Sequence, residues 1–185
     1  GVQGVLVYIA IYVAMTLGTF ACVLSMKRPG GMVENISDLS GLARTSPMMA
    51  FFFAMLLFSL AGIPPLAGFF AKFYVFSAAI KAGLYGLAII GVLTSVVGAY
   101  YYLAIVKVMY FDEPHKSFEP MPGEQALVLT FAGLFNILFI IYPAPLLDAA
   151  SVAAKSLFGM TFTLGPRAAK AGYRIREYER LDSTN

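Results

Sequence analysis

Long apolar stretches separated by short polar ones cover most of the chain. A membrane-spanning helix needs about 20 apolar residues, and four windows are long enough: residues 2–26, 48–80, 84–109 and 126–147. We expect each window to form one transmembrane helix. The pattern therefore predicts an all-α membrane protein, with four spans in a membrane domain over residues 1–158.

The second window is too long for one straight helix. Residues 47–82 would extend roughly 54 Å at about 1.5 Å per residue, against a hydrocarbon core of about 30 Å. Gly62, Pro64 and Pro65 favour an interruption, since the two prolines remove two backbone donors, and Gly68 adds flexibility. Broken backbone at membrane depth is tolerated only inside protein or beside water. We therefore expect a broken helix whose break is buried.

Composition agrees with a membrane protein and gives no sign of a catalytic centre. The chain is 59% hydrophobic and only 12% charged, whereas soluble domains carry about 25% charged residues. Its single cysteine, Cys22, excludes a disulfide framework or a thiolate metal cluster. His115 lies beside Asp112 and Glu113, which we interpret as a solvated loop and not a metal site. We predict no active site, metal or bound cofactor in this chain.

The loops differ in positive charge, which predicts their orientation. The first and third loops and their flanks carry more basic residues than the other side of the membrane: Lys27, Arg28, Arg44, Lys107 and Lys116, against Lys81 and Lys155. By the positive-inside rule, the first and third loops face the cytoplasm.

Residues 159–185 form a polar, basic tail. Four spans would place this tail on the non-cytoplasmic side, which the same rule disfavours, so we predict that it is not native to the membrane domain. The chain also opens at Gly1 without an initiator methionine. We expect it to be a fragment of a longer protein.

Lys72 is the main candidate for chemistry. It stands in an apolar stretch with no acidic residue nearby in sequence, and a lysine there is costly unless it meets water or a partner. A lysine withdrawn from water exchanges its proton readily when a neighbouring charge changes, so we predict a proton relay. The alternative is a side chain that extends to the interface. Thr94, Ser95 and Asn136 could hold water or simply bond a neighbouring carbonyl.

Residues 59–74, SLAGIPPLAGFFAKFY, resemble the broken helix of the antiporter-like, proton-translocating subunits of respiratory complex I (NADH:quinone oxidoreductase). Residues 38–47 resemble that family's cytoplasmic connector, and residues 100–103 resemble the next helix of its subunit N branch. The resemblance implies that the four spans are the C-terminal ones of a fourteen-helix fold. It also implies that Lys72 faces a hydrophilic axis through the membrane.

The same resemblance implies a function and partners. The protein would move protons in the bacterial inner membrane beside other membrane subunits of complex I, without binding nucleic acid. NADH, flavin, iron–sulfur clusters and quinone would be bound by other subunits of the complex. The family's earlier glutamate and lysines would precede Gly1, so we expect the fragment to be inactive alone. A subunit of a multi-component cation/proton antiporter, which shares the broken helix, remains an alternative.

The tail has a second resemblance. Residues 180–185, which include Ser183, Thr184 and Asn185, resemble the biotin-binding beginning of the catalytic domain of bacterial biotin–protein ligase, with Met160 as a possible start. Everything needed for adenylation would follow Asn185. We therefore expect a truncated ligase fusion or a join of two reading frames, without ligase activity; an ordinary polar tail is the alternative.

Overall fold

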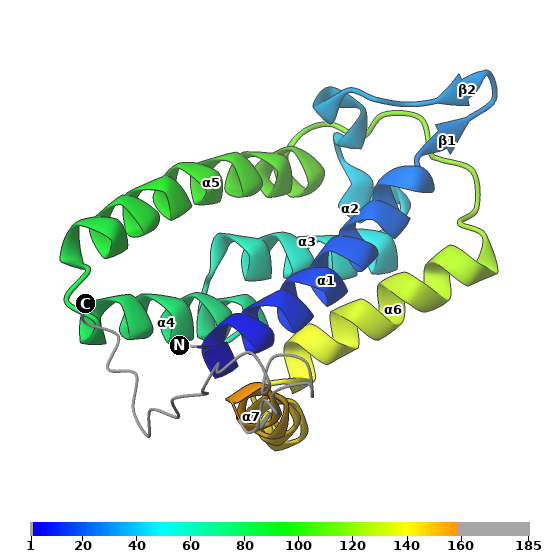
Figure 1. Ribbon diagram of the computed structural model, residues 1–185. Coiled ribbons are helices and arrows are strands. Elements are labelled where there is room, and N and C mark those ends of the chain that lie inside the picture. Colours follow the sequence, from blue (N-terminus) through cyan, green and yellow to red (C-terminus); the bar gives the residue numbers. More distant parts are fainter. Residues whose placement is uncertain (1, 159–185) are drawn as a thin grey trace, which may run out of the picture.

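The computed structural model describes residues 2–158, which are mostly helical (Figure 1). The helices in this range are α1 (Val2–Leu24), α2 (Leu42–Thr45), α3 (Pro47–Ala61), α4 (Ala67–Lys81), α5 (Tyr85–Phe111), α6 (Gly123–Leu138) and α7 (Ala144–Phe158). A short hairpin of β1 (Lys27–Arg28) and β2 (Gly31–Met32) and a 3-10 turn, η1 (Ile36–Leu39), connect α1 to α2. The all-α prediction omitted this hairpin, in which Gly30 of the turn and Gly31, the first residue of β2, both have positive φ. The tail, with Met160, Ser183, Thr184 and Asn185, lies outside the described residues.

Two of the predicted spans coincide with long helices. α1 and α5 contain 23 and 27 residues and, within the described range, are the helices long and apolar enough to cross a bilayer. α3 and α6 are apolar but shorter. The predicted count of four spans is not established by these lengths and stays a prediction.

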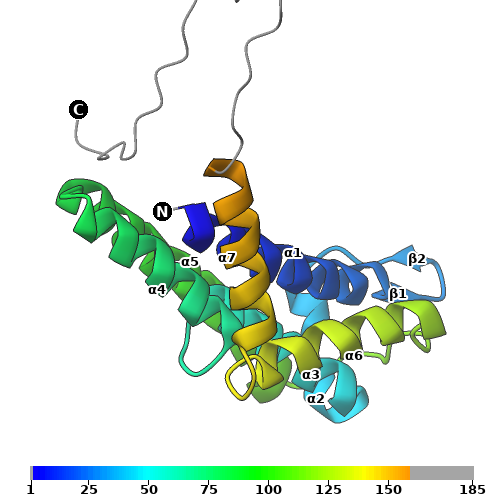
Figure 2. The ribbon, with the colours of Figure 1, turned by 60° about the horizontal axis from the view of Figure 1, so that its bottom comes forward.

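The fourth window, residues 126–147, does not form the single helix that we expected. α6 ends at Leu138, the chain turns, and α7 begins at Ala144. Pro143 and Pro145 account for this difference from the prediction, because proline lacks a backbone N–H and disfavours helical geometry in the residue before it. Seen end-on in Figure 1 and side-on in Figure 2, α7 runs across the other helices.

α1 lies at the centre of the helical packing and contacts α3, α4, α6 and α7. Gly18 permits a close approach to α3 and α6, since a Cβ there would lie 2.6 Å from the Cβ of Ala132 and 2.7 Å from a methyl of Leu56. Small residues let helices in membranes pack at short range. The centre of the core is therefore formed where α1, α3 and α6 meet.

Arg28 holds the two loops at one end of the bundle together. Its guanidinium donates to the Asp38 carboxylate at 2.8 Å and to the Asp38 carbonyl at 3.1 Å. A third N–H donates to the carbonyl of Lys116 at 3.1 Å, and the guanidinium carbon lies 5.0 Å from the centre of the Phe118 ring. One cation thus connects the loop after α1 to the loop before α6.

Replacing Arg28 by methionine is expected to loosen both loops. The change leaves the part-buried Asp38 carboxylate unpaired, and losing a hydrogen bond to a charged group costs roughly 1.5–3 kcal/mol. Limited proteolysis of native membranes should show faster cleavage between residues 27 and 38. Arg44→Met is the matched control, because Arg44 and Glu113 are 3.7 Å apart with both side chains largely exposed, and exposed pairs contribute little. Equal cleavage of the two variants would contradict the assignment.

Candidate functional site at the helix break

The break between α3 and α4 begins with a glycine that closes the end of α3. Gly62 is left-handed, with φ 87° and ψ 32°, a conformation that glycine adopts without a Cβ penalty. Its N–H donates to the Ser59 carbonyl at 2.9 Å, and the N–H of Ile63 donates to the Phe58 carbonyl at 3.0 Å. These two bonds form a Schellman cap. Neither cap bond goes to the last two carbonyls of the helix, those of Leu60 and Ala61.

Lys72 occupies the place of the donors that are missing. In an uninterrupted helix, the carbonyls of Leu60 and Ala61 would accept from the residues four positions on. Those residues are Pro64 and Pro65, which carry no N–H. The ammonium of Lys72, from α4, instead donates to the Leu60 carbonyl at 3.0 Å and to the Ala61 carbonyl at 3.2 Å. A cation at a helix C-terminus is also stabilised by the helix dipole.

A buried polar chain fixes the start of α4 against the end of α3. The backbone N–H of Gly68 donates to Ser59 Oγ at 2.9 Å, and this hydroxyl donates to Asn136 Oδ1 on α6 at 2.6 Å. The Asn136 amide donates to the Ala132 carbonyl at 2.9 Å. Ser59 and Asn136 are fully buried. These hydrogen bonds therefore link α3, α4 and α6 close to the end of α3, where Lys72 binds the last carbonyls.

Sequence reasoning missed the role of Ser59 and treated Asn136 as a generic polar residue. Asn136 lies 77 positions from Ser59, so no local pattern relates them. Gly62, Pro64, Pro65 and Gly68 all lie at the break or directly beside it, and Lys72 folds back onto it. Thr94 bonds the carbonyls of Ile90 and Gly91 in its own helix, which is the simpler of the two expected roles.

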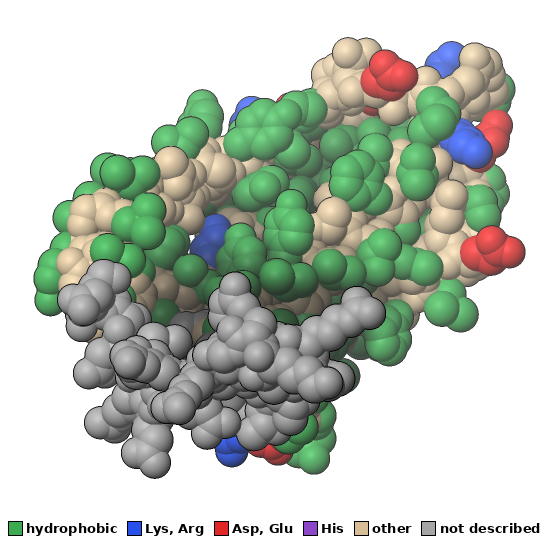
Figure 3. All heavy atoms as spheres, viewed as in Figure 1, with side chains coloured by type: hydrophobic (Ala, Val, Ile, Leu, Met, Phe, Trp, Pro, Cys, Tyr) green, Lys and Arg blue, Asp and Glu red, His purple; other side chains and the backbone are tan. Residues whose placement is uncertain are grey.

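Two cavities meet at Lys72. One, of about 330 Å³, lies between α4 and α5 and is mainly apolar, with Phe73 and Val92 among its lining residues. Figure 3 shows a basic side chain in the hollow between these two helices. The other, of about 210 Å³, lies between α1, α4 and α5. Among the described residues no carboxylate pairs with Lys72, and the hydrogen bonds of its ammonium go to the two carbonyls of α3.

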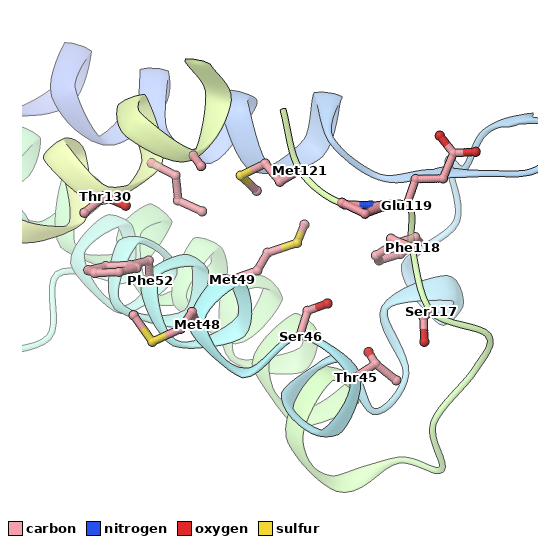
Figure 4. A pocket seen from close by; sticks show the side chains of 13 residues that line it. Thr45, Ser46, Met48, Met49, Phe52, Ser117, Phe118, Glu119, Met121 and Thr130 are labelled. Atoms are coloured by element: carbon pink, nitrogen blue, oxygen red, sulfur yellow. The ribbon is translucent and has the colours of Figure 1, made fainter. Parts of the chain in front are cut away.

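A larger pocket, of about 390 Å³, lies far from Lys72 in the loop region (Figure 4). The start of α3, the segment before α6 and α6 itself form its wall, with Met48, Met49 and Met121 prominent. Glu119 is its one ionisable lining residue, and the carboxylate points away from Met49 and Met121 (Figure 4). His115 lies in the nearby loop, where its backbone N–H bonds the Ser40 carbonyl. This pocket is larger but has no ionisable side chain directed into it. The helix break, where Lys72 binds two carbonyls, is therefore the better candidate site.

Comparison with known proteins agrees with the resemblance found at the break. The family model described as "NADH:quinone oxidoreductase/Mrp antiporter, TM" matches residues 1–98. NADH-quinone oxidoreductase subunit N of Parvibaculum lavamentivorans is 62% identical over 158 residues, 85% of this chain and 33% of the relative. Its counterpart in Azorhizobium caulinodans is 65% identical over the same shares. The chain thus spans about one third of the length of these relatives.

Among solved structures, respiratory complex I from Thermus thermophilus with bound aureothin contains a similar chain. The TM-score is 0.70 at 32% identity, and the match covers 81% of this chain and 34% of the other. The expected antiporter-like family is thereby confirmed. The resemblance of the tail to biotin–protein ligase finds no support in these matches.

Proposed function

Because the chain belongs to the NADH:quinone oxidoreductase/Mrp antiporter transmembrane family, we propose that it forms part of a proton-translocating subunit of respiratory complex I. The names of its relatives, subunit N of NADH-quinone oxidoreductase, favour this function over a cation/proton antiporter. Its partners would be the bilayer and other membrane subunits of the complex. The flavin, the iron–sulfur clusters and the NADH and quinone sites would lie in other subunits of the complex. The first and third loops would face the cytoplasm of a bacterium.

The observation that carries this proposal is the position of the Lys72 ammonium on the two free carbonyls of α3. The carbonyl dipoles and the helix end stabilise the charged form without a carboxylate. A neutral amine would lose one donor and the charge, and would be held less strongly. A change of charge elsewhere in the complex can then shift the balance between the two forms, so that Lys72 releases and regains a proton.

Replacing Lys72 by methionine in the whole complex tests the proposal. Removing a positioned proton-transfer group slows such steps roughly 100-fold, so we expect fewer protons taken up per NADH oxidised in inverted membrane vesicles. Proton uptake can be followed with a pH-sensitive dye while NADH oxidation is followed by absorbance. Unchanged uptake per NADH would overturn the proposal.

Two further variants separate proton transfer from helix capping. Lys72→Arg keeps a charge and several donors for the two carbonyls but does not release a proton near neutral pH. It should therefore assemble normally and still pump poorly; normal pumping would mean that Lys72 acts only as a cap. Lys81→Met is the matched control, since Lys81 is an exposed lysine in the last turn of the same helix.

A further inference from the structure

The position of Lys72 on α3 depends on a contact one helical turn earlier in α4. Gly68 and Lys72 are four residues apart and therefore lie on the same face of α4. A Cβ at Gly68 would collide with the backbone carbonyl of Ser59, and the Gly68 N–H donates to the Ser59 hydroxyl at 2.9 Å. This close contact therefore sets how the face of α4 that carries Lys72 is placed on the end of α3.

The Lys72 side chain tolerates little displacement from this position. Its stem passes close to Gly62, since a Cβ there would lie 3.0 Å from Lys72 Cδ and 3.4 Å from Nζ. The ammonium then reaches the Leu60 carbonyl at 3.0 Å and the Ala61 carbonyl at 3.2 Å. Ordinary N–H···O bonds extend to about 3.2 Å, so a small movement of α4 away from α3 breaks the longer contact.

Asn136 determines the direction of the hydrogen bonds at Ser59. The Asn136 amide nitrogen donates to the Ala132 carbonyl of its own helix at 2.9 Å, which leaves Oδ1 directed at Ser59, 2.6 Å from its hydroxyl oxygen. Because Oδ1 can only accept, the single hydroxyl proton of Ser59 must point to it. The lone pairs of the hydroxyl then accept from the Gly68 N–H. Asn136 therefore holds the hydroxyl in the orientation that docks α4.

The packing of α6 on α3 keeps Asn136 within reach of Ser59. Gly133 lies three residues before Asn136 on the same face of α6, and a Cβ there would collide with the ring of Phe52 on α3. Ser59 and Asn136 are fully buried, where a hydrogen bond is stronger than in water. The position of α6 on α3 is therefore linked to the position of α4 through one buried pair.

We propose that Asn136 and Ser59 are positioning residues for proton transfer at Lys72. Together they hold α4 where the ammonium reaches both carbonyls, although neither side chain bonds the ammonium itself. The proposal rests on the function proposed above. A misplacement of about 1 Å can slow a step that depends on geometry roughly 100-fold. Loss of either side chain should therefore impair proton transfer in complexes that are still assembled.

Two variants of the whole complex test the proposal from opposite ends of the bond. Ser59→Ala removes the hydroxyl, and Asn136→Leu removes its acceptor while leaving the hydroxyl in place. Ser25→Ala is the matched control for loss of a buried serine hydroxyl. Ser25 is 3% exposed, and its hydroxyl donates to the Cys22 carbonyl at 2.7 Å. It follows the last residue of α1 and lies outside the hydrogen bonds at the break.

Two measurements are made on assembled complex, at a temperature below the inactivation range of every variant. The distances from Lys72 Nζ to the carbonyl oxygens of Leu60 and Ala61 are measured in high-resolution maps. Protons taken up per NADH oxidised are measured in inverted membrane vesicles. This ratio does not depend on how much complex is retained, so lower stability alone leaves it unchanged.

We expect the ammonium to lose at least one of its two carbonyl contacts in Ser59→Ala and in Asn136→Leu. Proton uptake per NADH should fall several-fold in both variants and stay normal in Ser25→Ala. Unchanged carbonyl contacts, or an equal fall in Ser25→Ala, would overturn the proposal. Normal uptake by both break variants, beside a defective Lys72→Met, would overturn the positioning role and leave the proposed function standing. Normal uptake by Lys72→Met would instead defeat the proposed function, and with it the role of the pair in proton transfer.

Discussion

Replacing Gly68 by leucine is expected to prevent the two halves of the broken helix from docking. A Cβ at this position would collide with the backbone carbonyl of Ser59 and lie 2.9 Å from its hydroxyl oxygen. These atoms belong to the end of α3 and cannot turn aside like the tip of a flexible side chain. Forcing extra carbon atoms into a packed core costs about 1–3 kcal/mol or more, and the bond from the Gly68 N–H would be lost as well. We expect little assembled protein in native membranes.

Gly86→Leu is the matched control for this change. Gly86 also lies in a helix, α5, but a Cβ there meets nothing within 4 Å. Its variant should assemble like the unaltered protein, as measured by the amount of subunit retained in the complex on native gels. If Gly68→Leu assembles equally well and loses activity at the same temperature, α3 and α4 do not approach each other as described.

Removing the Ser59 hydroxyl is expected to have the second largest effect on stability. Ser59→Ala would leave two buried polar groups without partners, the N–H of Gly68 and Oδ1 of Asn136. Each unsatisfied buried group costs roughly 1–3 kcal/mol. Thermal inactivation of the variant in native membranes should therefore occur at a distinctly lower temperature.

A double-mutant cycle shows whether Ser59 and Asn136 act as a pair. Asn136→Leu removes the acceptor of the Ser59 hydroxyl. The double variant contains neither the Ser59 hydroxyl nor Asn136 Oδ1, so no unpaired side-chain atom is left at this contact. The stability changes caused by substitutions in one hydrogen-bond network are not additive. The double variant should therefore lose less stability than the two single variants lose in total. Strict additivity would mean that the bond contributes nothing. Ser156→Ala is a suitable control, because that exposed hydroxyl bonds only a carbonyl three residues earlier in its own helix.

Features that depend on local properties of the chain could be predicted from the sequence. The windows over 2–26 and 84–109 correspond to α1 and α5, because length and hydropathy are local and need no partner. The interruption before Gly68 also follows from local chemistry, since two adjacent prolines cannot donate backbone hydrogen bonds. Lys72 could be singled out in the same way, because a lysine in an apolar stretch with no acidic residue nearby is visible in the sequence itself.

Contacts between distant segments were decided only by the tertiary structure. Leucine and alanine carbonyls carry no signal in a sequence, so nothing local indicated that Lys72 would replace the donors absent from Pro64 and Pro65. The bond between Ser59 and Asn136 needs α3 and α6 side by side, and the smaller cavity beside Lys72 needs α1, α4 and α5 together. By itself the sequence determined where helices form and break and which residue is costly to bury. The packing of the helices determined which groups satisfy the break, because hydrogen-bond partners depend on position in space.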